Sequence, residues 1–225
     1  MLTEANIQNY FNMNIKELNN YLQSLPEEII SDAEHITRED MAKVAEVSEL
    51  YVYAQSMTSL QGIEYFESLT TLICTMNQLT SLDLSKNTKL MGLNCDINPL
   101  KSLDLSQNTA LTQLTCSENQ LESLDLSQNT ALTGLSCSMN QLESLDLSPN
   151  TALTMLYCNS NLLTSMDISK NTALNIFICH DNPGDGSTFR VTTWDDLDIP
   201  MLFTKDDWVF NGQTISILYQ NATGE

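Results

Sequence analysis

A fixed period of 21 residues is the feature that most constrains this chain. Cysteine returns at that interval, at Cys74, Cys95, Cys116, Cys137, Cys158 and Cys179. Asparagine follows three positions later each time, at Asn77, Asn98, Asn119, Asn140, Asn161 and Asn182. The shared unit reads LxxLxCxxNxLxxLDLSxNTx. A short fixed period indicates stacked coils, in which each coil buries its apolar side chains against the next. We therefore expect a solenoid.

Each unit consists of two similar halves. LxxLxCxxN is followed by LxxLDLSxN, as at residues 79–87. Both halves alternate apolar and other residues at the period of a short strand with one buried face, and neither has room for a helix. We predict a flat right-handed solenoid of the α+β class, with a short parallel strand on each side of every coil. Because both sides advance by about 4.8 Å per coil, curvature should be slight.

Asparagine occupies a second column, in the other half of the unit, at Asn87, Asn108, Asn129, Asn150 and Asn171. A buried Asn carries both donors and an acceptor, so it can satisfy backbone groups in a turn that Leu would leave without partners. Both columns are predicted to be structural.

The cysteine column is predicted to be part of the core. In Leu114-Thr115-Cys116 the alternation points Leu and Cys inward. Neighbouring Cys Cβ atoms would lie about 4.8 Å apart, whereas a disulfide needs about 3.8 Å. A zinc site needs converging Cys or His ligands, and neither His35 nor His180 is placed to join the column. The thiols should be free, small hydrophobic groups, and no cofactor or metal is expected.

The ends of the chain are predicted to cap the stack. We divide the chain into a helical N-terminal cap at 1–45, leucine-rich coils at 46–182 and a β-rich C-terminal cap at 183–225. Helical spacing runs from Ile7 to Leu25, and a second helix starts at Thr37 with a capping box. Residues 208–219 read as a hairpin around Asn211-Gly212. The large aromatic residues of this segment should cover the last coil: Trp194, Phe203, Trp208 and Phe210.

The Cys-bearing unit with LDLSxNT resembles secreted or surface leucine-rich-repeat proteins of gut and oral Bacteroidetes, and is more distantly similar to the internalins. SLQGIEYFESLTTL resembles their opening coil, and NPGDGSTFRVTTW with NGQTISILY resembles their C-terminal cap. The resemblance covers residues 46–220. It implies an extracellular or cell-surface protein that binds another macromolecule without catalysis. Residues 1–45 contain no DxDxDG loop, so no calcium site is carried over.

The charge of the chain excludes some partners. Nine Lys and Arg residues stand against 29 Asp and Glu residues, which gives a net charge of −20. Such a surface repels nucleic-acid phosphates and anionic lipids and favours a monomer. No apolar run is long enough to span a bilayer, so no integral membrane segment is expected.

If the inward positions are core, specificity lies in the outward positions beside the cysteines. These vary from coil to coil, and Tyr, Met and Ile at the two ends suit a protein or peptide partner. A glycan ligand or a spacer without any ligand remains an alternative. The candidate partner-binding residues are Tyr51, Tyr53, Ile73, Asn94, Asp96, Thr115, Ser136, Met155, Tyr157, Asn159, Ile176, Ile178 and His180.

The opposite side carries a column of carboxylates at Asp83, Asp104, Asp125, Asp146 and Asp167. Stacked carboxylates repel one another, so each needs a stabilising partner. Hydrogen bonds to the adjoining turn are the favoured explanation, and divalent cations in a calcium-dependent adhesion module are the alternative.

No catalytic constellation is expected. Ser138 and His180 lie two coils apart, about 10 Å, which is beyond the reach of a nucleophile and its base. The sequence also lacks GxSxG, GxGxxG, P-loop and HExxH motifs.

Overall fold

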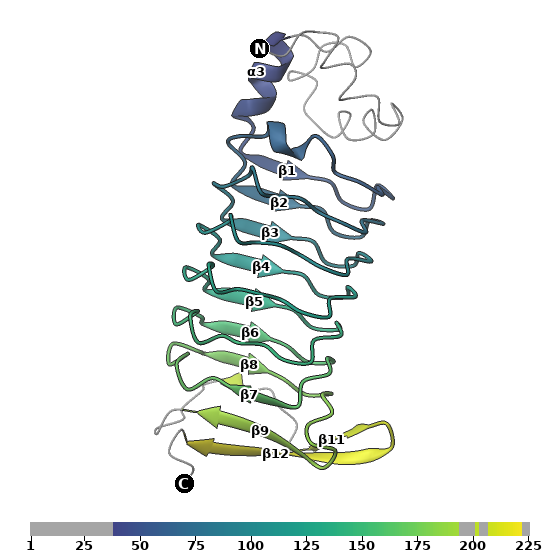
Figure 1. Ribbon diagram of the computed structural model, residues 1–225, viewed down its shortest axis with the longest axis vertical. Coiled ribbons are helices and arrows are strands. Elements are labelled where there is room, and N and C mark those ends of the chain that lie inside the picture. Colours follow the sequence, from purple (N-terminus) through teal and green to yellow (C-terminus); the bar gives the residue numbers. More distant parts are fainter. Residues whose placement is uncertain (1–37, 194–200, 203–206, 222–225) are drawn as a thin grey trace.

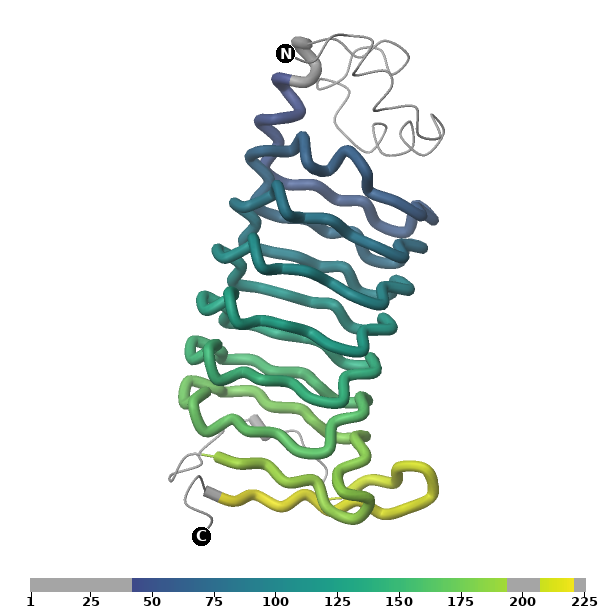
Figure 2. The backbone as a smooth tube through the Cα atoms, in the orientation of Figure 1, coloured from purple at the N-terminus to yellow at the C-terminus, as the bar shows by residue number. Residues whose placement is uncertain are grey.

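The computed structural model describes residues 38–193, 201–202 and 207–221. These residues form a nearly straight column of stacked coils, with a helix at one end and a small sheet at the other (Figures 1 and 2). The predicted helix at 7–25, the cap residue Thr37, and Trp194 and Phe203 lie outside the described residues. Within the described ranges, no helix is long and apolar enough to cross a membrane. The predicted division of the chain at residues 45 and 182 stays a prediction.

One continuous parallel sheet runs along the column, and we call it the Cys-side sheet. Its strands stack in register, so that Leu93, Leu114 and Leu135 are partners on neighbouring coils. In spatial order they are β1 (Glu49–Tyr51), β2 (Thr71–Ile73), β3 (Gly92–Asn94), β4 (Gln113–Thr115), β5 (Gly134–Ser136), β6 (Met155–Tyr157), β8 (Ile176–Ile178) and β10 (Met201–Leu202).

The core fills the column between its two sides. The inward Leu residues of both halves of the unit are buried, and the repeat cysteines are 0% exposed. All six thiols are free. Desolvation raises the pKa of Cys74 and Cys137 to about 12, so these thiols stay protonated at neutral pH. The prediction that the cysteines are core residues is confirmed.

The prediction of a strand on both sides of every coil is wrong. On the side that carries the Asp column, which we call the Asp side, the described coils form one strand, β7 (Ser165–Asp167). In the other coils, the backbone groups that a strand would bond to its neighbour have other partners. The N–H of Ser106 donates to the Oδ1 atom of Asp104, two residues earlier, at 2.9 Å. The carbonyl of Leu105 accepts from the N–H of Asn108 and the amide of Asn129. β7 forms because its neighbour is the cap strand β9 (Thr188–Thr193).

The first asparagine column closes the corner after each Cys-side strand. Asn119 Nδ2 donates to the carbonyls of Cys95, Cys116 and Ser117, each at 3.1 Å, and its Oδ1 accepts the N–H of Leu100 at 3.1 Å. One side chain therefore joins two coils and satisfies both donor and acceptor groups. The structural role predicted for this column is confirmed.

The second asparagine column, on the Asp side, is bonded through its donors. Asn129 Nδ2 donates to the carbonyls of Leu105 at 3.1 Å and Asn108 at 2.9 Å. The Oδ1 atoms of Asn87, Asn108, Asn129, Asn150 and Asn171 are buried and have no hydrogen-bond partner. This column is structural as predicted, but it satisfies backbone carbonyls and no N–H group.

The corner before each Asn of the first column has left-handed backbone. Met76, Ile97, Glu118, Met139, Ser160 and Asp181 all have φ between 54° and 58°. A residue with a Cβ, and above all a β-branched one such as Ile97, pays about 1–2 kcal/mol for this conformation. The Asn hydrogen bonds hold the corner in place whatever residue occupies it.

Helix α3 (Arg38–Glu46) and the 3-10 turn η1 (Ile63–Tyr65) lie at the N-terminal end. Val44 of α3 is buried, as the predicted second helix requires. At the other end β9 pairs in parallel with β12 (Gln213–Asn221), which forms the predicted hairpin with β11 (Asp207–Phe210).

Aromatic residues close the C-terminal end. Trp208 is buried and donates its indole N–H to the Asn182 carbonyl at 2.7 Å. Its ring meets Phe189 edge to face, with centroids 5.7 Å apart. Phe210 packs partly buried against the core. Among the described aromatic residues of this segment, the predicted capping role is confirmed.

Candidate functional site

The outward side chains of the Cys-side sheet form one continuous surface, which we call the Cys-side face. Strand alternation places Ile73, Asn94, Thr115, Ser136, Tyr157 and Ile178 in its central column, and parallel register aligns them. Asp96, Asn159 and His180 lie in the next column, at the end of each strand. The structure thus brings the sequence-predicted residues onto a single surface.

The middle of the Cys-side face is a chain of polar contacts from coil to coil. Asp96 Oδ1 accepts the N–H of Ser117 at 2.6 Å, and Ser117 and Ser136 share a hydroxyl hydrogen bond of 2.8 Å. On the same coil as Ser136, Ser138 donates to Asn159 Oδ1 of the next coil at 2.7 Å. These bonds hold the polar side chains in fixed positions.

Two carboxylates lie in the columns of the Cys-side face: Glu49 is exposed at the N-terminal end, and Asp96 is half-buried nearer the middle. Desolvation raises its pKa, and the hydrogen bond from Ser117 N–H opposes that effect. The columns contain no Lys or Arg. The middle of the face therefore presents hydrogen-bonding groups and one negative charge.

Apolar and aromatic residues lie at the two ends of the face. Tyr51 and Tyr53 are 53% and 55% exposed, so the N-terminal end of the face is open. At the other end Met155, Tyr157, Ile176 and Ile178 are half-buried on the adjacent strands β6 and β8. Such residues beside small polar ones are the usual composition of a protein interface.

The structure does not assemble a nucleophile with a base from the residues of this face. His180 Nδ1 contacts Asp181 Oδ2 at 2.7 Å, whereas the Ser138 hydroxyl contacts Asn159. The 180–186 turn likewise uses its acids internally, because Asp185 Oδ1 accepts the N–H groups of Ser187 and Thr188. Within the described ranges no three His, Cys, Asp or Glu side chains are grouped to hold a metal ion.

The carboxylates of the Asp side are stabilised by their own turns. In each coil one Asp oxygen accepts the N–H two residues later, as Asp125 does from Ser127 at 2.9 Å. These hydrogen bonds lower the pKa of Asp83, Asp104, Asp125 and Asp146. The favoured explanation for the column, hydrogen bonding to the turn, is confirmed.

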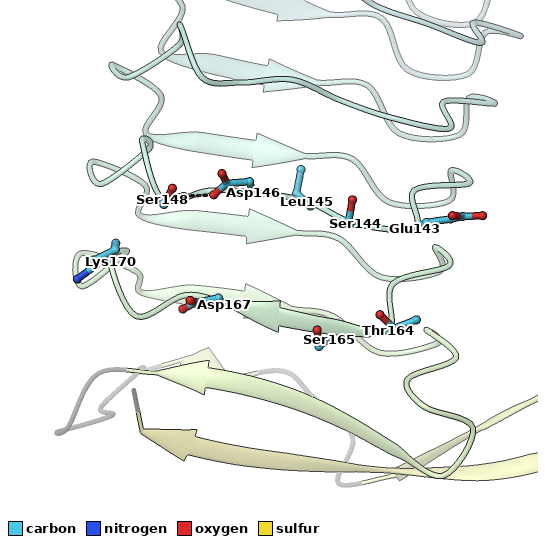
Figure 3. Close-up of a pocket in the computed structure, with 9 residues that line it drawn as sticks. All are labelled: Glu143, Ser144, Leu145, Asp146, Ser148, Thr164, Ser165, Asp167 and Lys170. Atoms are coloured by element: carbon cyan, nitrogen blue, oxygen red, sulfur yellow. Dashed lines mark hydrogen bonds between the residues drawn. The ribbon is translucent and has the colours of Figure 1, made fainter. Parts of the chain in front are cut away.

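Shallow grooves lie between coils on the Asp side, and sequence reasoning did not find them. One lies beside Ser144, Asp146, Ser165 and Asp167 (Figure 3), and an equivalent one lies two coils earlier. They arise where the backbone ladder is missing, so furrows separate neighbouring coils. The invariant Ser column at 81, 102, 123, 144 and 165 is the sequence signal that accompanies them.

No protein-family model and no curated protein matches the sequence. Several solved structures are similar to it. The functional domain of InlJ from Listeria monocytogenes, which includes a cysteine ladder, is 30% identical over 71% of this chain and 47% of its own, with a TM-score of 0.46. The leucine-rich-repeat protein LIC12759 of Leptospira interrogans is 22% identical over 68% of this chain and 41% of its own, with a TM-score of 0.62.

Internalin C2 of Listeria monocytogenes is 21% identical over 91% of this chain and 92% of its own, with a TM-score of 0.56. The chain spans less than half the length of the first two of these structures. Together with the stacked parallel strands and the Asn columns, the likenesses to LIC12759 and internalin C2 establish the fold. The chain is a leucine-rich-repeat solenoid, distantly similar to the internalins.

Proposed function

We propose that the chain is a non-catalytic recognition scaffold that binds a protein or peptide on the Cys-side face. The observation that carries the proposal is a contrast within each coil. Inward Leu, Cys and Asn residues repeat with little change, whereas the outward residues of the same strands differ, as at Asn94, Thr115, Ser136 and Tyr157. A backbone held by a continuous ladder can display such differences without loss of its core.

The chemistry of the face favours a protein or peptide over a glycan. Glycan binding would draw on the polar groups of the middle coils, yet these already bond within the chain: Asn94 Oδ1 accepts the N–H of Asp96, and Asn159 Oδ1 accepts from Ser138. The exposed tyrosines and the apolar cluster on β6 and β8 remain available for contact. Large side chains of this kind carry most of the binding energy in protein interfaces.

The likeness to the internalins and the net charge of the chain support a proposal for its location and oligomeric state. Internalin-like proteins act at the surface of a cell or outside it, and we propose an extracellular or cell-surface location and a monomeric state for this chain. The net charge of −20 supports both solubility and a partner with basic groups.

The test is capture of partners from mucosal-tissue and bacterial-surface extracts, run beside a glycan array. The double variant Tyr157→Ser and Ile178→Ser should lose the captured protein while keeping its circular dichroism and melting temperature. Asp125→Ser, on the Asp side, is the matched control and should capture the protein as the unaltered chain does. Capture that is lost with Asp125→Ser and kept by the double variant would move the site to the other side. Binding to the glycan array alone would replace the protein partner by a sugar.

A further inference from the structure

A row of exposed side chains follows the corners at the carboxyl ends of the Cys-side strands. Met76, Ile97, Glu118 and Met139 occupy it on four successive coils, and we call it the corner ridge. In Figure 1 the strands β2 to β5 point toward this edge of the column. Met76, Ile97 and Met139 are 43%, 39% and 52% exposed, which is unusual for side chains of this size.

The backbone conformation of the corner ridge is also unfavourable for these residue types. Each residue has left-handed φ, near 55°, a conformation that Gly and Asn adopt most readily and that β-branched Ile resists. Neither burial nor conformational preference favours Met or Ile at these positions. The fold gains nothing from the bulky apolar side chains, so a contact outside the chain explains them better.

The spacing of the ridge is fixed by hydrogen bonds between coils. The N–H groups of Met76, Ile97, Glu118 and Met139 donate to carbonyls of the next coil at 2.9–3.0 Å. The four side chains therefore stand at the strand spacing, at about 0, 4.8, 9.6 and 14.4 Å along the column. An α-helix lying along the ridge presents positions i, i+3, i+7 and i+10 at about 0, 4.5, 10.5 and 15 Å. A β-strand presents one face about every 6.8 Å, which does not match.

The charge of Glu118 favours a basic residue at the third contact position of such a helix. Glu118 is exposed and stands between apolar Ile97 and Met139, so it would face position i+7. A Lys or Arg there would pair with Glu118, and the net charge of −20 favours a basic partner.

We propose that the corner ridge is a docking surface for an amphipathic helix of the partner, with apolar residues at i, i+3 and i+10 and a Lys or Arg at i+7. The ridge borders the Cys-side face, but the inference does not depend on that face. A partner can engage the ridge alone.

The test selects binders to the full chain from two displayed libraries, one with random residues on one face of a stable helix and one of unstructured linear peptides. Helical binders with the stated pattern are expected. Their affinity should fall at least tenfold for the triple variant Met76→Asn, Ile97→Asn and Met139→Asn, since several central contacts are lost together. The triple variant should melt no lower than the unaltered chain, because Asn tolerates left-handed backbone.

Three other variants serve as controls for this test. Glu118→Lys should weaken helices with Lys or Arg at i+7 and spare those with other residues there. Met91→Asn removes a methionine that is 49% exposed just before β3, at the opposite edge of the sheet, and should change nothing. Tyr157→Ser with Ile178→Ser should also leave ridge binding intact, which separates this inference from the proposed function. Selection of linear peptides only, of no binders, or of helices that bind the triple variant equally well would overturn the proposal.

Discussion

The two sides of each coil start from the same apolar–x–apolar pattern and end as different structures. On the Cys side, the outward Thr115 stands between buried Leu114 and Cys116 in a strand bonded to both neighbouring coils. On the Asp side, Asp125 stands between buried Leu124 and Leu126, and its carboxylate turns back to bind Ser127 N–H. The outward Asp does not decide this by itself, because Asp167 accepts the Ser169 N–H in the same way and yet lies in β7, which pairs with β9. The residues of the core beneath are buried on both sides.

The difference has a consequence for function. A ladder-bonded side can vary its outward residues freely, and the Cys side does so. The Asp side needs an Asp and a Ser in each turn to hold its backbone, and these recur unchanged from coil 83–85 to coil 167–169. Sequence variation is therefore concentrated on the side where it costs the fold least.

The largest expected effect is a loss of unfolding free energy at alkaline pH, which comes from the buried thiols of the Cys side. Burial raises the pKa of the thiols, so their contribution to stability is complete below the ordinary thiol pKa, near 9.0, and is lost as pH rises toward about 12. In that range each thiol should lower the unfolding free energy by about 1.4 kcal/mol per pH unit. Denaturant unfolding between pH 8 and 11 measures this slope.

The matched control is the triple variant Cys95→Ala, Cys116→Ala and Cys137→Ala. It removes three of the six thiols, so the alkaline slope should fall by about half, even though its stability at neutral pH is lower. An unchanged slope would show that the thiols are not the groups that titrate on unfolding.

The next effect compares the two asparagine columns. Asn119→Ala should cost about 3 kcal/mol, because the buried N–H of Leu100 loses its acceptor. Asn129→Ala should cost about 1 kcal/mol, because the carbonyls of Leu105 and Asn108 keep their turn hydrogen bonds. Urea unfolding of both variants measures the difference. The two substitutions remove the same atoms. Equal losses of unfolding free energy would therefore contradict the different hydrogen-bonding roles assigned to the two columns.

The smallest effect concerns the carboxylates of the Asp side. Their lowered pKa means that their contribution is present above the ordinary Asp value of 3.8 and is lost as pH falls through the folded-state pKa. A variant with Asp104→Asn, Asp125→Asn and Asp146→Asn keeps the oxygen that accepts the Ser N–H and no longer titrates. Its melting temperature should depend less on pH below pH 5 than that of the unaltered chain. A steeper dependence would contradict the assignment.

Features that repeat in every unit were predictable from the sequence. Burial of Cys116, closure of the corner by Asn119 and the alignment of the candidate residues on one surface all follow from the 21-residue period and strand alternation. The hairpin at Asn211-Gly212 followed from a local turn signal.

Features that depend on competition between hydrogen-bond partners were not predictable. Asp125 carries the same apolar–x–apolar signal as Thr115. Its hydrogen bond to the turn was predicted, but the structure was needed to show that no strand forms beside it. The left-handed corners were also hidden, because Met76 and Ile97 are not residues that signal such a backbone. The contact between Asp96 and Ser117 joins residues 21 positions apart that the repeat itself does not require.

Amide hydrogen exchange on the free chain tests the contrast between the two sides most directly. Cys116 N–H donates to the Ser136 carbonyl within the ladder at 2.8 Å, whereas Ser127 N–H donates to an exposed carboxylate. Cys-side amides should exchange at least roughly a hundredfold more slowly than the Ser amides of the Asp side, because they open only with larger unfolding. Equal protection on the two sides, or stronger protection at Ser127 than at Cys116, would contradict this account.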